Sequence, residues 1–124
     1  MFDLKALLTK ILNCLIVEDI TNKITFDSAW TEIYKKAYKI GNVVYFGLEG
    51  YVSGTFVAGT QYTMATIASG YRPRIYMPVQ AHITNSSYQP TGISNSWVWG
   101  DGSITVRPQN TNGRYFFISG TYVI

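Results

Sequence analysis

The sequence has very few residues that could act as reactive side chains or metal ligands: it contains one cysteine, Cys14, and one histidine, His82. A lone cysteine cannot form an intrachain disulfide, so we expect a fold without one and synthesis in a reducing cytoplasm. The two residues fall in different predicted elements and give no zinc-binding spacing, and no Asp-rich loop indicates calcium. We therefore expect neither a metal site nor a cofactor.

Acidic residues are also scarce, since Asp101 is the only one after Glu49. A glycosidase needs two convergent carboxylates about 5 to 9.5 Å apart, and the spacing of Asp27, Glu32 and Glu49 does not point to a partner for Asp101. His82 lies on the polar face of its predicted strand with no nucleophile motif beside it, which favours a surface or subunit-interface position over a catalytic base. We expect that the protein is not an enzyme.

Clustered positive charge and long apolar runs are both missing. The 4 arginines are dispersed between Arg72 and Arg114, and the 6 lysines, between Lys5 and Lys39, are balanced by 6 acidic residues in the same part of the chain. Nucleic-acid binding needs basic residues gathered on one face, so we expect no nucleic-acid partner. No apolar stretch reaches the roughly 20 residues of a membrane span, and we expect no membrane insertion.

Apolar and aromatic residues are plentiful. Hydrophobic residues make up 47% of the chain and aromatic residues 15%, a composition that fits a packed β-rich domain far better than a disordered chain. A length of 124 residues corresponds to one domain. We expect no second independent core and find no internal repeat.

The first segment, from Phe2 to about Val17, is predicted to be a helix because it lacks glycine and proline and is rich in leucine, lysine and alanine. An apolar seam with the spacing of a coiled coil runs along it, formed by Leu4, Leu8, Ile11 and Leu15. Further apolar residues widen this seam, which favours three strands over two, or packing on the chain's own domain. Helices this short need a partner surface, so we favour self-association; an amphipathic helix lying on its own sheet is the alternative.

The apolar pattern changes from helical to alternating at Trp30. We interpret residues 1–20 as an oligomerising helix, residues 21–29 as a polar linker and residues 30–124 as a β head domain. The first strands are expected from Trp30 to Ile40 and from Val43 to Val52, joined by a tight Gly41-Asn42 turn. One face of the second strand is apolar and consists of Val44, Phe46, Leu48 and Val52.

The clearest alternation lies between Arg74 and Thr84, where every second residue is apolar. This pattern predicts one core-facing set, Ile75, Met77, Val79, Ala81 and Ile83. Pro78 cannot donate to a strand ladder, so we expect this strand at an edge or beside a bulge.

Four further strands complete the expected head. They cover Thr60 to Ile67, Ser94 to Trp99, Ser103 to Arg107 and Arg114 to Ile124, separated by loops or turns at 69–73, 85–92, 100–102 and 110–113. Seven or so strands spaced about ten residues apart, with no second helix, predict an all-β antiparallel sandwich or jelly-roll-like head. Because Tyr122 to Ile124 still have strand character, we expect no C-terminal tail.

Four short segments follow the N-terminal helix in order: Lys39-Ile40-Gly41-Asn42-Val43-Val44, Ala68-Ser69-Gly70-Tyr71-Arg72-Pro73, Asp101-Gly102-Ser103-Ile104 and Ile118-Ser119-Gly120-Thr121-Tyr122. Their order and spacing over residues 30–124 resemble the C-terminal receptor-binding or tip domains of phage tail fibre and baseplate proteins, especially from phages and prophages of Gram-positive bacteria. Such domains usually follow a long shaft or tail-attachment region, whereas this chain has a single helix there. It is therefore either part of a longer fibre or a stand-alone relative.

The resemblance implies a homotrimer in which three β-sandwich heads stand on a short coiled-coil neck. It also implies a place in the virion tail, contacts with other tail or baseplate proteins, and binding of host cell-surface carbohydrate.

The residues themselves also favour sugar recognition, because aromatic rings can stack on the apolar face of a pyranose while amides and hydroxyls meet its hydroxyl groups. The strand from Arg74 runs into the 85–92 loop and the strand from Ser94 runs out of it, so we expect their ends to meet at one rim. The candidate saccharide-binding residues are His82, Asn85, Tyr88, Gln89, Asn95, Trp97, Trp99 and Asp101.

Two other interpretations remain open at the level of sequence. Each of the two tryptophans could belong to the core or to a subunit interface, because large aromatic side chains are usually mostly buried. The head could then be a purely structural trimerisation knob of a tail fibre or related particle, with no ligand. A protein-binding head is a third possibility.

Overall fold

The computed structural model describes residues 2–124, with the side chains of residues 13–15 outside the described set. Within this part the chain forms one helix and nine strands, which confirms the predicted all-β class with a short N-terminal helix. The elements are α1 (Leu4–Leu15), β1 (Val17–Asp19), the 3-10 turn η1 (Thr21–Lys23), β2 (Ile24–Phe26), β3 (Trp30–Ile40), β4 (Val43–Val52), β5 (Tyr62–Ile67), β6 (Met77–Thr84), β7 (Pro90–Val98), β8 (Ser103–Pro108) and β9 (Tyr115–Val123).

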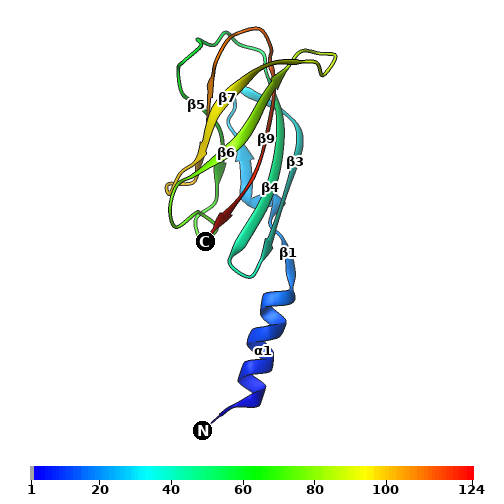
Figure 1. The fold of residues 1–124 in the computed structure, drawn as a ribbon, viewed down its shortest axis with the longest axis vertical. Coiled ribbons are helices and arrows are strands. Elements are labelled where there is room, and N and C mark those ends of the chain that lie inside the picture. Colours follow the sequence, from blue (N-terminus) through cyan, green and yellow to red (C-terminus); the bar gives the residue numbers. More distant parts are fainter. Residues whose placement is uncertain (1) are drawn as a thin grey trace.

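The strands form one curled antiparallel sheet in the order β1-β3-β4-β9-β6-β7-β8-β5-β2 (Figure 1). Strand β6 joins its two halves, because it pairs with β9 on one side and with β7 on the other. The halves share one core, to which β4 contributes Phe46 and Leu48, β9 contributes Phe116, and β8 contributes Ile104 and Val106. The halves therefore face each other as the layers of a sandwich do, but they remain one sheet.

Strands β3 and β4 have the bounds expected from their alternation, with Gly41 at a φ of 58° in the turn between them. A positive φ favours glycine, which has no Cβ to clash. The predicted inner face of β4 is also confirmed, since Val44, Phe46, Leu48 and Val52 are all buried.

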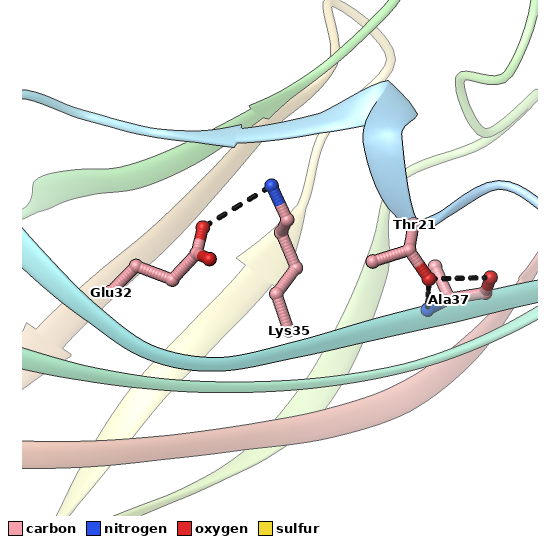
Figure 2. Close-up of polar contacts among 4 residues, drawn as sticks. All are labelled: Thr21, Glu32, Lys35 and Ala37. Atoms are coloured by element: carbon pink, nitrogen blue, oxygen red, sulfur yellow. Dashed lines mark hydrogen bonds and ion pairs between the residues drawn. The ribbon is translucent and has the colours of Figure 1, made fainter.

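The interpretation of residues 1–20 as a helix is wrong from Val17 to Ile20, and that of residues 21–29 as a linker is wrong from Thr21 to Phe26. Strand β1 pairs with β3 and β2 pairs with β5, so consecutive short strands occupy the two edges of the sheet. Ile20 and Ile24 are completely buried. Figure 2 shows that the Thr21 hydroxyl accepts from the Ala37 N–H (3.0 Å) and donates to the Ala37 carbonyl (3.3 Å), near the Lys35 to Glu32 ion pair (3.2 Å). This segment thus closes the core where the sheet's edges approach.

Helix α1 projects from the end of the head that carries the β3–β4 turn (Figure 1). It begins at the N-cap Asp3, whose Oδ1 accepts from the Ala6 N–H (3.1 Å). The predicted seam residues Leu4, Leu8 and Ile11 are all exposed, while the side chain of Leu15 lies outside the described set. The described side chains of the helix therefore do not pack on the sheet. No helix among the described residues is long and apolar enough to cross a membrane.

The predicted core face of β6 is correct in its second half only. Ala81 and Ile83 are buried and Val79 packs against the core, but Met77 is 39% exposed and Ile75 67% exposed. The reason lies in the pairing: β9 covers β6 only from Gln80 to Thr84, and residues 74–76 precede the strand. Pro78 falls where β6 is paired on one side, as its missing N–H predicts.

A pair of matched substitutions tests this register. We expect Ile83→Asp to lower the free energy of unfolding by roughly 3 to 5 kcal/mol, because it buries an unpaired charge. Ile75→Asp should change it by less than about 0.5 kcal/mol, because the side chain is in solvent. Chemical denaturation followed by circular dichroism measures both, and equal effects would contradict the register.

Candidate functional site

A polar and aromatic cleft lies at the end of the head opposite α1, where the turns after β6 and before β9 approach β4. Its volume is about 310 Å³, and we call it the distal cleft. Its main lining residues are Tyr51, Asn85, Thr111, Asn112, Arg114 and Tyr115. Of these, Asn85 belongs to the candidate set inferred from the sequence.

Four aromatic rings form a continuous surface beside the cleft. Tyr51 and Tyr115 are cross-strand partners on β4 and β9, with ring centroids 5.0 Å apart. Tyr88 extends the surface, since its centroid lies 6.0 Å from that of Tyr115 and 5.9 Å from that of Phe117. The Tyr88 side chain is 59% exposed, so this surface is open to a ligand.

The 85–89 loop that carries Tyr88 is organised by Asn85. The Asn85 Oδ1 accepts from the N–H groups of Ser87 (2.9 Å) and Gln89 (3.1 Å), and its Nδ2 donates to Gln89 Oε1 (3.1 Å). Tyr88 has a φ of 59°, a conformation that costs a residue with a side chain on the order of 1 kcal/mol. The loop thus holds Tyr88 in a strained conformation with its ring against β9.

His82 and Glu49 lie on the same outer surface, on either side of Phe117 in the strand register. His82 is exposed. The Oε1 atom of Glu49 is buried and has no hydrogen-bond partner among the described residues, and a buried acceptor left unpaired is costly. Of these two side chains, His82 therefore offers an exposed polar group beside Phe117, whose ring the Tyr88 ring contacts.

Trp97 and Trp99 form a second aromatic cluster with Tyr76, which we call the aromatic platform. The three ring centroids are 5.6 to 5.8 Å apart. Both tryptophans are half-buried and Tyr76 is 55% exposed. The Trp99 Nε1–H donates to Thr105 Oγ1 (2.8 Å), which fixes the indole and uses its only donor. The tryptophans are thus neither core residues nor freely exposed.

The expected single rim is not formed, because the two groups of candidate residues lie at opposite ends of the β6–β7 hairpin. Trp97 pairs with Pro78 at the start of β6, whereas Thr84 at its end pairs with Pro90. The rise per residue of a strand places Pro90 and Trp97 roughly 20 Å apart. Asn85, Tyr88 and Gln89 are therefore at the distal end, and Trp97 and Trp99 are with Tyr76 at the other end.

The remaining two candidate residues, Asn95 and Asp101, belong to neither aromatic cluster. Asn95 is exposed between the two clusters on β7 and pairs with Arg107. Asp101 lies in the β7–β8 turn, where its Oδ1 accepts from the backbone N–H (2.9 Å) and the hydroxyl (2.7 Å) of Ser103. Asp101 therefore stabilises the hairpin. No group of three histidine, cysteine, aspartate or glutamate side chains that could hold a metal is found among the described residues.

Several residues of these clusters were missed from the sequence. Tyr51 and Tyr115 alternate with the buried Val52 and Phe116, so their outward direction could be predicted, but their contact depends on the β4–β9 register. Asn112 and Arg114 enter the cleft through the turn before β9. Tyr76 joins the platform because the β6–β7 register, in which Met77 pairs with Val98 and Pro78 with Trp97, brings the residue before Met77 next to Trp99. None of these pairings has a local sequence signal.

Comparison with known proteins finds no matching protein-family model and no significant match among curated sequences. The function of this chain is therefore inferred from the arrangement of its side chains.

The hydrogen bonds in the β7–β8 turn give a titration prediction. Those from the Ser103 hydroxyl and then from its N–H hold the pKa of Asp101 below its ordinary value. Because folding favours the carboxylate, this stabilisation is present at neutral pH and is lost as the pH falls through the lowered pKa. We expect Ser103→Ala to raise the pKa of Asp101, as measured by NMR titration of the carboxyl carbon. Ser69→Ala, at an exposed position elsewhere, is the control and should leave this titration unchanged.

Proposed function

We propose that this protein is a non-catalytic saccharide-binding domain, the head of a phage tail or baseplate receptor-binding protein that recognises carbohydrate on the surface of its host. The observation that carries the proposal is the distal cleft, which combines tyrosine rings with neutral hydrogen-bonding side chains. This combination suits a sugar, whose ring has an apolar face and whose rim carries hydroxyl groups.

The chemistry of the cleft supports recognition rather than reaction. Asn112 and Thr111 are exposed in the turn before β9 and offer an amide and a hydroxyl, while Tyr51 and Tyr115 offer ring surface. Arg114 is already engaged, since its Nη1 donates to the Gly54 carbonyl. Hydrolysis of a glycosidic bond would need two facing carboxylates, and the main lining residues of the cleft include none.

The position of the cleft agrees with this role. Its lining residues come from the end of β4, the start of β9 and the turns after β6 and before β9, and these segments lie at the end of the head farthest from α1 (Figure 1). A neck that attaches to other tail or baseplate proteins would therefore present the cleft outwards, toward the host surface.

Saccharide binding should depend on the cleft tyrosines. With the cell-wall saccharide that gives the strongest signal on a glycan array, Tyr51→Ala should weaken binding about tenfold, roughly 1.4 kcal/mol, because a stacking ring is removed. Tyr45→Ala is the matched control, since Tyr45 is exposed on the same face of β4 near the neck. Calorimetry measures both.

The possible results are distinct. Loss of binding in Trp97→Ala with no change in Tyr51→Ala would move the site to the aromatic platform. The absence of any saccharide ligand would favour the structural alternative.

The structural alternative, a trimerisation knob without a ligand, is favoured by a different observation, the unpartnered neck helix. Its apolar side chains Leu4, Leu8, Ile11 and Leu12 are between 48% and 60% exposed. So much exposed apolar surface on one helix is typical of an interaction site. We propose that three copies of α1 pack together along this seam, which is compatible with either function.

The oligomer prediction has two parts. Light scattering should give three times the chain mass of 13.9 kDa. Removal of residues 1–15 should leave a monomer whose β circular dichroism is largely unchanged, because the described helix side chains do not pack on the head. Leu8→Asp should have the same effect as the truncation, and Lys10→Asp, at an exposed polar helix position, is the control. A full-length monomer would contradict the prediction.

A further inference from the structure

An apolar pocket opens at the same end of the head as the distal cleft, but on the inner side of the sheet. Val52 and Phe116 are adjacent in sequence to the cleft tyrosines and point in the opposite direction, so they form part of the pocket's wall. Trp30, Phe56, Tyr62 and Val106 complete most of its apolar lining. The pocket has a volume of about 230 Å³, and we call it the apolar pocket.

Aromatic rings stand nearly perpendicular around this space. Phe116 meets Trp30 at 88° with centroids 5.0 Å apart and Phe56 at 76° with centroids 5.7 Å apart. Phe56 in turn meets Tyr62 at 79° and 6.3 Å. Rings at nearly right angles to each other line adjacent sides of the pocket. They leave its interior open, whereas parallel stacked rings would fill it.

Backbone contacts hold these walls in place. Gly50 lies under Trp30, and a Cβ at this position would be 3.2 Å from the Trp30 ring and 2.7 Å from that of Phe26. The Trp30 Nε1–H donates to the Thr63 carbonyl (3.2 Å). Trp30 is therefore fixed by close packing on one side and by a hydrogen bond on the other.

The loop between β4 and β5, green in Figure 1, contributes Gly54, Thr55 and Phe56 to the lining and is also anchored. Its Val57 N–H donates to the Tyr62 hydroxyl (2.7 Å), and its Gly59 N–H donates to the Pro108 carbonyl (2.8 Å). The Arg114 guanidinium lies over the Phe56 ring at 5.9 Å. The pocket is thus a built feature and not a gap under a loose loop.

The size and lining of the pocket define the ligand it fits. An apolar protein cavity of ~150 Å³ is large enough to bind benzene, so this pocket can hold one or two rings. Of the described residues that line the pocket, Asp27 is the only charged one, and its exposed carboxylate disfavours an anion in the pocket. We propose that the apolar pocket binds a small neutral or cationic ligand whose buried part is one or two apolar rings.

No described residue lines both the apolar pocket and the distal cleft, so ligand binding in the pocket can be tested independently of the proposed saccharide binding. The probes are indole, tryptamine and indole-3-acetate, which share a ring system and differ in charge. In an NMR titration of the full chain, we expect saturable shifts of the amides of residues 52–62, 106 and 116. Indole and tryptamine should bind with a Kd below about 1 mM, and indole-3-acetate at least threefold more weakly.

Two variants define the site. Ala29→Trp places a large side chain at the mouth of the pocket and should weaken indole binding at least tenfold, while Ser28→Trp, at an exposed neighbouring position outside the lining, should not. Tyr51→Ala, which tests the distal cleft, should also leave indole binding unchanged. The amide spectra establish that each variant is folded. The proposal is overturned if the folded wild type shows no saturable shifts at these amides, or if Ala29→Trp binds indole as the wild type does.

Discussion

Strand β6 forms backbone hydrogen bonds on both of its sides, and the architecture of the head depends on this double pairing. From Gln80 to Thr84 the strand has β9 as one neighbour, while β7 pairs along its other side. Without the first set of bonds, β1, β3, β4 and β9 would form a sheet separate from β6, β7, β8, β5 and β2. Because β6 belongs to both halves, they remain one sheet. This sheet curls so that the inner faces of its two halves enclose one core.

The same curl determines where ligand surfaces can form. At the distal end, consecutive residues of β4 and β9 point alternately outward and inward: Tyr51 and Tyr115 face the distal cleft, and Val52 and Phe116 face the apolar pocket. Arg114 connects the two, since it lines the cleft and also contacts the loop and ring that wall the pocket. Two cavities of different chemistry therefore share one pair of strands and one arginine.

Much of the fold could be predicted from local patterns. The bounds of β3 and β4 followed from alternation and from the Gly41-Asn42 turn, and the helix followed from its composition. Strands β1 and β2 were missed because three residues are too few to show a period, and their place at the two sheet edges depends on contacts distant in sequence. The exposure of Ile75 was missed because alternation predicts two faces but not the extent of the neighbouring strand.

The candidate site was only partly predictable for the same reason. The residue types and the loop around Tyr88 were identified, and the structure places Asn85, Tyr88 and Gln89 together. Their separation from Trp97 and Trp99 was missed because the strand after the loop begins at Pro90 and is nine residues long. A one-dimensional pattern shows that two segments join the same loop, but not how far along a strand a side chain lies.

The route of the chain from α1 into the head has a mechanical consequence. Helix α1 leads through Ile16 directly into β1, which pairs with the end of β3 through Val17, Glu18 and Asp19. The next residue, Ile20, is completely buried, and its N–H donates to the Ala37 carbonyl (2.9 Å). Strand β1 continues upward from the helix along the molecule's long axis (Figure 1). A tensile load on α1 is therefore transmitted along β1 in shear, so that the β1–β3 hydrogen bonds resist it together instead of opening one after another.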